Sequence, residues 1–125
     1  MNSPSTAKDR YPYPNEPTWS RSERAIARKV FDAALKRELR EVMRETKRMA
    51  SQIQEPADVW RLERYLTQRR KDIDRKYEFR SSQLTRVVGT LLCEGRVTEE
   101  ELRGLGEDKL HLIHSCAKFL AEDAA

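Results

Sequence analysis

The fold is decided by the stretch at residues 60–80, which reads WRLERYLTQRRKDIDRKYEFR. It is highly charged, has apolar residues at helical spacing, and lies in a proline-free run between Pro56 and Gly95. This run predicts one helix from residue 56 to residue 94, ~38 residues and roughly 55 Å long. Such a helix exceeds the width of a small domain, and its apolar stripe is thin. Another surface must cover it, which indicates a protein that works by binding other proteins.

The apolar stripe of this helix repeats every eleven residues. Leu62 and Ile73 are eleven residues apart, as are Ile73 and Leu84. An eleven-residue period is close to the natural period of the α-helix, so the stripe runs nearly straight. We therefore expect a homodimer that forms through the long helices, with the stripe as the interface. The predicted interface residues are Val59, Leu62, Leu66, Ile73, Tyr77 and Leu84.

Composition favours an all-α fold. The 125 residues include only four glycines and 7% aromatic residues, with 37% charged residues. No apolar run is longer than three residues, so no segment is expected to span a membrane. Cys93 and Cys116 are expected to be small core residues in a reducing compartment, and the chain is predicted to be cytoplasmic.

The chain divides into a tail and one domain. Residues 1–18 hold four of the five prolines and are predicted to be a disordered tail. Residues 19–125 are predicted to form a single helical domain. Two long helices in a hairpin are followed by two short C-terminal helices.

Local signals place the helix ends. Capping boxes of the form Ser/Thr-x-x-Glu begin at Ser20 and at Thr98 and predict the start of a helix at each. Pro56 suits the first turn of the second long helix, and Gly95 predicts its end. A last helix is predicted from the apolar residues Leu110, Ile113, Cys116, Ala117 and Leu120.

The stretch at residues 60–80 also carries the excess positive charge. It holds eight Lys or Arg and four Asp or Glu, in a chain whose net charge is +4. Trp60 lies off the apolar stripe, with Glu63 and Arg64 on the same side of the helix. Trp60 either packs against the first helix or the tail, or it is an exposed aromatic anchor of the kind that carries protein interfaces. These residues alone leave both interpretations open.

A set of residues at fixed spacing runs through both long helices. In the first helix the set is Trp19, Ser20, Glu23, Phe31, Arg37, Glu38, Leu39 and Ile53. In the second it is Trp60, Leu62, Leu66, Arg70, Ile73, Asp74, Lys76, Tyr77, Arg80, Leu91, Leu92, Glu94 and Gly95. Together, over residues 19–95 and without gaps, this pattern resembles the fluorescence recovery protein family, the helical partners of the cyanobacterial orange carotenoid protein.

The resemblance implies both a partner and a mode of action. The family forms all-α homodimers that bind the light-activated red form of the carotenoid protein and speed its return to the orange form. It acts by binding, with no bond made or broken, so the resemblance implies a non-enzymatic photoprotection module. By position, Trp60 and Arg70 match the family's interaction patch.

Two residues beside Trp60 depart from the family pattern, which has His and Asp at the positions of Glu63 and Arg64. Arg64 reverses a charge, and Glu63 replaces a group that can be neutral with an anion. Like-charge contacts at interfaces can cost several kcal/mol. We therefore predict a partner-binding site at Trp60, Glu63, Arg64 and Arg70, and a weak or lost activity toward the carotenoid protein.

Two other kinds of binding protein remain as alternatives. A basic helical nucleic-acid-binding protein is one, because seven cations between Arg61 and Lys76 could meet phosphates. Interleaved acids such as Glu63 and Asp72 count against it, and no helix-turn-helix motif is evident. The other is a helical scaffold for an unrelated protein partner.

Catalysis and cofactor binding find no support in the sequence. No nucleophile elbow and no glycine-rich phosphate loop is present, so neither an enzyme nor a cofactor is predicted. His111 and His114, with Asp108 and Cys116 nearby, have a spacing that could hold a metal. Such groupings are common by chance, and solvent-facing or capping histidines are the more ordinary interpretation, so no metal site is predicted.

Overall fold

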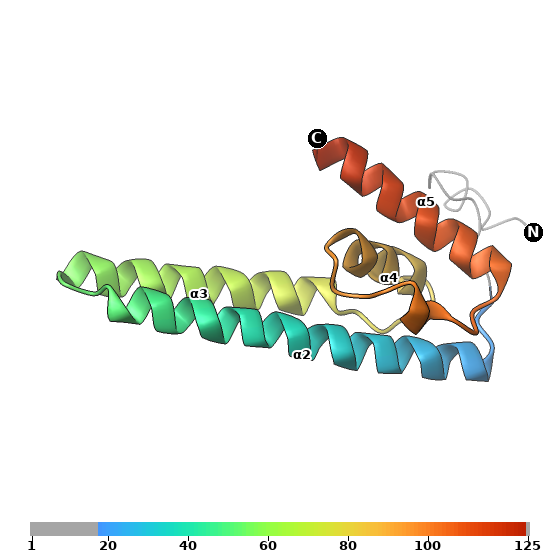
Figure 1. Cartoon of the computed structure of the whole chain (residues 1–125), viewed down its shortest axis with the longest axis horizontal. Helices are drawn as coiled ribbons and strands as arrows, with labels where there is room; N and C mark the ends of the chain where they lie inside the picture. Colours follow the sequence, from blue (N-terminus) through green and yellow to red (C-terminus); the bar gives the residue numbers. More distant parts are fainter. Residues whose placement is uncertain (1–17, 125) are drawn as a thin grey trace, which may run out of the picture.

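The computed structural model describes residues 18–124, and every regular element in this range is a helix. The elements are α2 (Arg21–Ser51), α3 (Pro56–Lys76), α4 (Leu84–Cys93), the short 3-10 helix η1 (Glu100–Leu102) and α5 (Glu107–Ala124). α2 and α3 lie side by side as a long arm, and α4, η1 and α5 gather at one end as a head (Figure 1). The predicted all-α fold is confirmed. The predicted tail, apart from Thr18, lies outside the described residues.

Local sequence signals set several helix ends as predicted. The Ser20 hydroxyl accepts a hydrogen bond from the Glu23 amide at 3.1 Å, and the Glu23 carboxylate accepts one from the Ser20 amide at 2.9 Å. Thr98 and Glu101 exchange the same pair of bonds at the start of η1. α3 begins on its proline. Gly95 follows α4 with φ of +74°, a backbone conformation that glycine adopts without steric cost.

The prediction of one helix from residue 56 to residue 94 is wrong, because the chain leaves the helix at residues 77–83. The rings of Tyr77 and Phe79 both pack edge-on against Phe31 of α2, with centroids 6.1 and 5.2 Å apart. Residues i and i+2 point to nearly opposite sides of a helix, so a continuous helix could not bring both rings to Phe31. The Arg28 guanidinium lies over the Phe79 ring, 3.8 Å from its centroid. Contacts with α2 therefore end the helix.

The break changes the role of two predicted interface residues. Leu84 begins α4 and is fully buried in the chain's own core, so its assignment to a dimer interface is corrected. Tyr77 is partly buried against that core, and its hydroxyl donates a hydrogen bond to Glu38. The eleven-residue repeat requires one continuous helix, so the stripe ends at Ile73.

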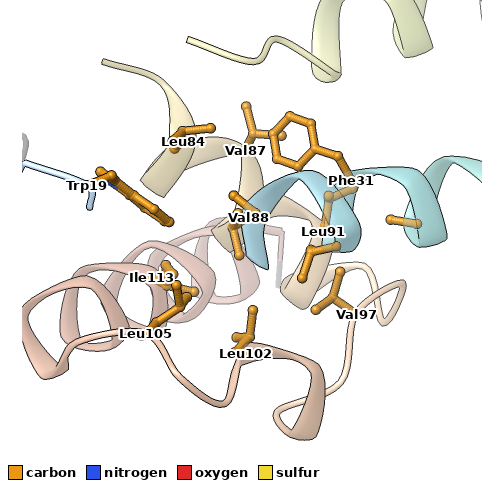
Figure 2. Packing of buried hydrophobic residues seen from close by; sticks show 13 residues of the cluster. Trp19, Phe31, Leu84, Val87, Val88, Leu91, Val97, Leu102, Leu105 and Ile113 are labelled. Carbon is orange, nitrogen blue, oxygen red and sulfur yellow. The ribbon is translucent and has the colours of Figure 1, made fainter. Parts of the chain in front are cut away.

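The core lies in the head and at the part of α2 that the head covers. Figure 2 shows side chains of α4, among them Val88 and Leu91, meeting side chains from the other elements. Their partners in this cluster are Trp19, Phe31, Val97, Leu102, Leu105 and Ile113. α3 contributes no buried residue. The head is therefore packed as a core, whereas most of the arm is surface.

Gly89 allows α4 and α5 to pack closely. A Cβ at this position would lie 2.8 Å from the Cβ and 2.9 Å from the Sγ of Cys116 on α5. It would also lie 3.2 Å from the carbonyl oxygen of Ile113. Since these atoms belong to a closely packed interior, a methyl group could be accepted only if the two helices moved apart.

We expect Gly89→Ala to lower the free energy of unfolding by about 1–3 kcal/mol, the usual cost of overpacking a core. Alanine favours a helix by about 1 kcal/mol over glycine, which offsets part of the loss. Equilibrium unfolding in urea measures the change. Cys93 of the same helix is exposed, so its predicted place in the core is wrong, whereas Cys116 is buried as predicted. Cys93→Ala is therefore the control and should change stability little. A Gly89→Ala protein as stable as the parent would show that moving α4 and α5 apart costs no more than the about 1 kcal/mol that alanine gains as a helix former.

Candidate functional site

The four predicted partner-binding residues all lie on α3 and are all exposed. Trp60 is 60% exposed, which favours an exposed anchor over a side chain packed against α2. Glu63 accepts a hydrogen bond from the Thr67 hydroxyl, one turn along the helix, at 2.9 Å. The indole and the charges around it are therefore available to a partner.

Helix geometry divides these residues between two faces of α3. At about 100° per residue, Arg64 lies about 40° around the helix from Trp60, on the side away from α2. Glu63 and Arg70 lie about 60° and 80° from Trp60 in the opposite sense, and Arg70 is also about 15 Å along the axis. The structure thus brings Trp60 and Arg64 together, whereas Arg70 borders the apolar stripe.

The apolar stripe of α3 remains open in the single chain. Val59 and Leu66 are 42% and 39% exposed, and Leu62 and Ile73 are partly buried. A helix of 21 residues without one buried side chain is unusual for a folded domain, whose helices bury an apolar face. The stripe is therefore a surface that the chain itself does not cover.

Two residues of α2 extend this apolar surface. Leu39 and Met43, one turn apart, are 45% and 57% exposed. Leu39 lies about 100° around α2 from Glu38, and Leu66 lies about 60° around α3 from Arg69. Glu38 and Arg69 contact each other across the arm, so each marks the side of its helix that faces the other helix. Because α2 and α3 run in opposite directions (Figure 1), the turn from Glu38 to Leu39 and the turn from Arg69 to Leu66 lead to the same side of the arm. We call Leu39, Met43, Val59, Leu62, Leu66 and Ile73 the apolar face. Sequence reasoning missed its α2 half, because helical spacing places these residues in the packed stripe of the first helix.

A buried carboxylate joins α3 to the rest of the chain. Glu38 of α2 is fully buried, and Lys76 Nζ lies 3.0 and 2.9 Å from its two oxygens. Arg69 Nη2 lies 2.7 Å away, the Tyr77 hydroxyl donates at 2.9 Å, and Arg96 Nε lies at 3.4 Å. Burial alone would raise the pKa of Glu38, but hydrogen bonds from Lys76 and Tyr77 outweigh burial and hold the pKa below its ordinary value. Glu38 is therefore charged and is the centre of the network.

Two further carboxylates surround this centre. Lys76 Nζ lies 2.7 Å from Glu94, and Arg96 lies 2.8 Å from Glu94 and 3.1 Å from Glu41. The hydrogen bond from Arg96 keeps the pKa of Glu41 below its usual value. Glu94 and Arg96 belong to the loop after α4, so the network fixes the end of α3 to both α2 and the head. Nothing local in the sequence signals the burial of Glu38.

Two other carboxylates attach the head to α2. Glu23 accepts hydrogen bonds from the backbone amides of Ser20 and Gly106, which lower its pKa to about 2. Glu101 receives two parallel hydrogen bonds from Arg37, at 2.9 and 2.7 Å, and these lower its pKa to about 2. The head is thus held to α2 by ion pairs and hydrogen bonds as well as by its core.

His111 and His114, whose spacing could hold a metal, both lie on α5. His114 Nε2 lies 2.8 Å from a Glu99 oxygen. Within residues 18–124, no group of three or more His, Cys, Asp or Glu is arranged to hold a metal ion. Over the same residues, no helix combines the length and the apolar character needed to cross a membrane. A small polar cleft of about 200 Å³ lies between α3 and α4, lined by Asp72, Arg75, Lys76, Arg86 and Thr90.

The chain is similar to one family of known proteins. The family described as "Photoprotection regulator fluorescence recovery protein" matches residues 19–117, so the predicted resemblance continues beyond Gly95 into α5. The fluorescence recovery protein of Synechocystis sp. is 38% identical over 104 residues, which cover 83% of this chain and 95% of that protein.

Solved structures of fluorescence recovery proteins have a similar fold. The Fremyella diplosiphon fluorescence recovery protein has a TM-score of 0.77 at 37% identity, over 81% of this chain and 99% of that chain. The Synechocystis structure has a TM-score of 0.77 at 38% identity, with the same coverage. With its all-α arm and head, and with the family pattern matched over most of its length, the chain belongs to the fluorescence recovery protein family.

Proposed function

We propose that this chain is a cytoplasmic photoprotection regulator that acts by binding an orange-carotenoid-type protein through α3. The exposed Trp60 carries the proposal, because a large aromatic side chain that its own fold leaves in solvent is the kind of residue that anchors protein interfaces. Arg70, the second position that matches the family patch, is exposed on the same helix. Binding, and not bond chemistry, is the proposed mode of action.

The binding unit is proposed to be a homodimer that buries the apolar face. The support is that α3 has no buried residue in the single chain, while Val59 and Leu66 are exposed beside Leu39 and Met43 of α2. A two-fold dimer would bring this face against the same face of a second copy, so the exposed apolar side chains of both copies would be covered. Trp60 and Arg64 point away from this side and would stay accessible in the dimer.

The activity on a cyanobacterial carotenoid protein is proposed to be weak or lost. Among the charged residues within one helical turn of Trp60, Arg64 is the nearest in direction, and no described residue neutralises it through an ion pair. A partner that is complementary to an aspartate at this position would meet an uncompensated cation. Glu63 adds a fixed anion on the other side of the indole.

The test is the rate at which the red form of a cyanobacterial carotenoid protein returns to the orange form, followed by absorbance in the dark. We expect this chain to accelerate recovery at least about tenfold less than a cyanobacterial family member, since like-charge contacts cost several kcal/mol. The double variant Glu63→His with Arg64→Asp should regain much of the difference. Lys71→Asp makes the same charge reversal as Arg64→Asp, two turns further along the exposed side, and is the control. Recovery as fast as with the cyanobacterial protein would refute the proposed loss of activity.

A further inference from the structure

The positive charge of the chain is concentrated on α2, and much of it is unused within the fold. α2 carries ten Lys or Arg and five Asp or Glu. The cations that contact other side chains are Arg24, Arg28, Arg37 and Arg48. The other six are exposed, and none of them forms an ion pair within the described residues. Five of these six define what we call the basic stripe: Lys29, Lys36, Arg40, Arg44 and Lys47.

The basic stripe follows the outer face of α2. At about 100° per residue, its five members fall within a sector of about 80°, on the side opposite Glu38, which faces α3. From Lys29 to Lys47 the stripe is about 27 Å long. Figure 1 shows α2 along one edge of the molecule, with α3 and the head on its other side. The stripe is therefore open along its whole length.

The acidic residues of α2 leave most of the stripe uncompensated. Glu38 and Glu41 belong to the network with α3 and Arg96, and Glu45 pairs with Arg48. Glu23 caps the start of the helix. Asp32 borders the stripe between its first two members, so the part from residue 36 to residue 47 is the most strongly positive.

We propose that the basic stripe is a second interaction surface, distinct from Trp60 and bordering the apolar face at Met43, and that it docks an acidic helix of a partner protein. Lys36, Arg40 and Lys47 repeat at intervals of four and seven residues, the spacing of one helix face. A helix that lies alongside with carboxylates at the same intervals would place one opposite each cation. Exposed pairs contribute little individually, so the stripe acts mainly by speeding and orienting the encounter.

A nucleic acid fits this surface less well. Duplex phosphates follow a curved path, so a straight row of about 27 Å meets only a short part of it. The five residues of the stripe are lysines and arginines, with no aromatic side chain on which a base could stack and no amide that could read a base edge. The charge of the stripe would attract a nucleic acid, but the helical spacing of its cations favours an acidic helix as the partner.

The test uses a fluorescent, alanine-based helical peptide with glutamates at intervals of four and seven residues. Binding is measured by anisotropy at about 50 mM and about 200 mM salt. Lys36→Glu with Arg40→Glu and Lys47→Glu should weaken binding at least about tenfold at low salt. The matched control is a triple variant that should weaken peptide binding less than about threefold. It combines Lys71→Glu, Arg75→Glu and Lys118→Glu. Both triple variants lower the net charge from +4 to −2 and change only exposed positions.

The same experiment contains the results that would overturn the proposal. Equal losses in both triple variants would show an effect of net charge and no docking site. Tighter binding of a duplex DNA of about 20 base pairs, lost with the stripe, would make it a nucleic-acid surface. No binding of the peptide at low salt would also reject it. If the glutamate variant fails to show a helical circular dichroism spectrum, the corresponding glutamine variant takes its place.

Discussion

Replacing Glu38 with alanine should lower the free energy of unfolding by about 3–5 kcal/mol, the usual loss when one member of a buried ion pair is removed. The reason is that Arg69, Lys76 and Arg96 would remain as partly buried cations without their shared anion. The Tyr77 hydroxyl would lose its acceptor as well. A loss of this size is a large part of the stability of a small domain, which is about 5–15 kcal/mol.

Equilibrium unfolding in urea measures this loss, with Glu45→Ala as the matched control. Glu45 pairs with Arg48 on the exposed surface of the same helix, and its removal should change stability little. Glu38→Gln keeps the shape of the side chain but removes its charge, so its free energy of unfolding should lie between those of the parent and Glu38→Ala. A loss of less than about 1 kcal/mol for Glu38→Ala would mean that water replaces the carboxylate and that the network does not fix α3.

Acid provides a second readout of the same network. The pKa of Glu38 is lower in the folded chain than the value of about 4.3 for an unfolded glutamate. The stabilisation is therefore present above the unfolded pKa, and it is lost as the pH falls through the folded pKa. Glu38→Ala should lose less further stability than the parent over this acidic range, because that part of its pH dependence is already gone.

Features that depend on a few neighbouring residues could be predicted from the sequence. The capping boxes at Ser20 and Thr98 and the helix end at Gly95 are local, so the residues that make them are adjacent in the chain. The break after α3 is different. Tyr77 and Phe79 are acceptable in a helix, and what removes them from it is Phe31, more than forty residues earlier. Leu84 was misplaced for the same reason.

Charge was harder to interpret than apolar spacing. Counting cations in windows directs attention to residues 60–80, whereas the longest line of unpaired cations lies on α2. The line on α2 can be recognised only when each cation is assigned to a face of its helix and the cations that form ion pairs are set aside. Glu38 shows the converse, since it looks like any surface glutamate among charged neighbours and yet is fully buried. Trp60 could be recognised as unusual from its position off the stripe, but its exposure required the structure.

Leu66→Glu should convert the proposed homodimer into a monomer. Leu66 lies in the apolar face, and in a two-fold interface the substitution appears on both copies. Burying each new carboxylate without a partner costs several kcal/mol, so the dimer dissociation constant should rise by a factor of at least about 1,000. Leu66 is a better choice than Leu62, which is partly buried and whose replacement would also disturb the packing of α3 on α2.

Light scattering after gel filtration measures the mass directly, at micromolar protein. The parent should elute at about twice the chain mass and Leu66→Glu at the chain mass. Gln68→Glu adds the same charge at an exposed position on another side of α3, about 200° around the helix, and should remain dimeric. A parent protein that is monomeric at this concentration would reject the homodimer. If Leu66→Glu stays dimeric while the parent is a dimer, the two copies meet through a different surface, and the apolar face is then open to another partner.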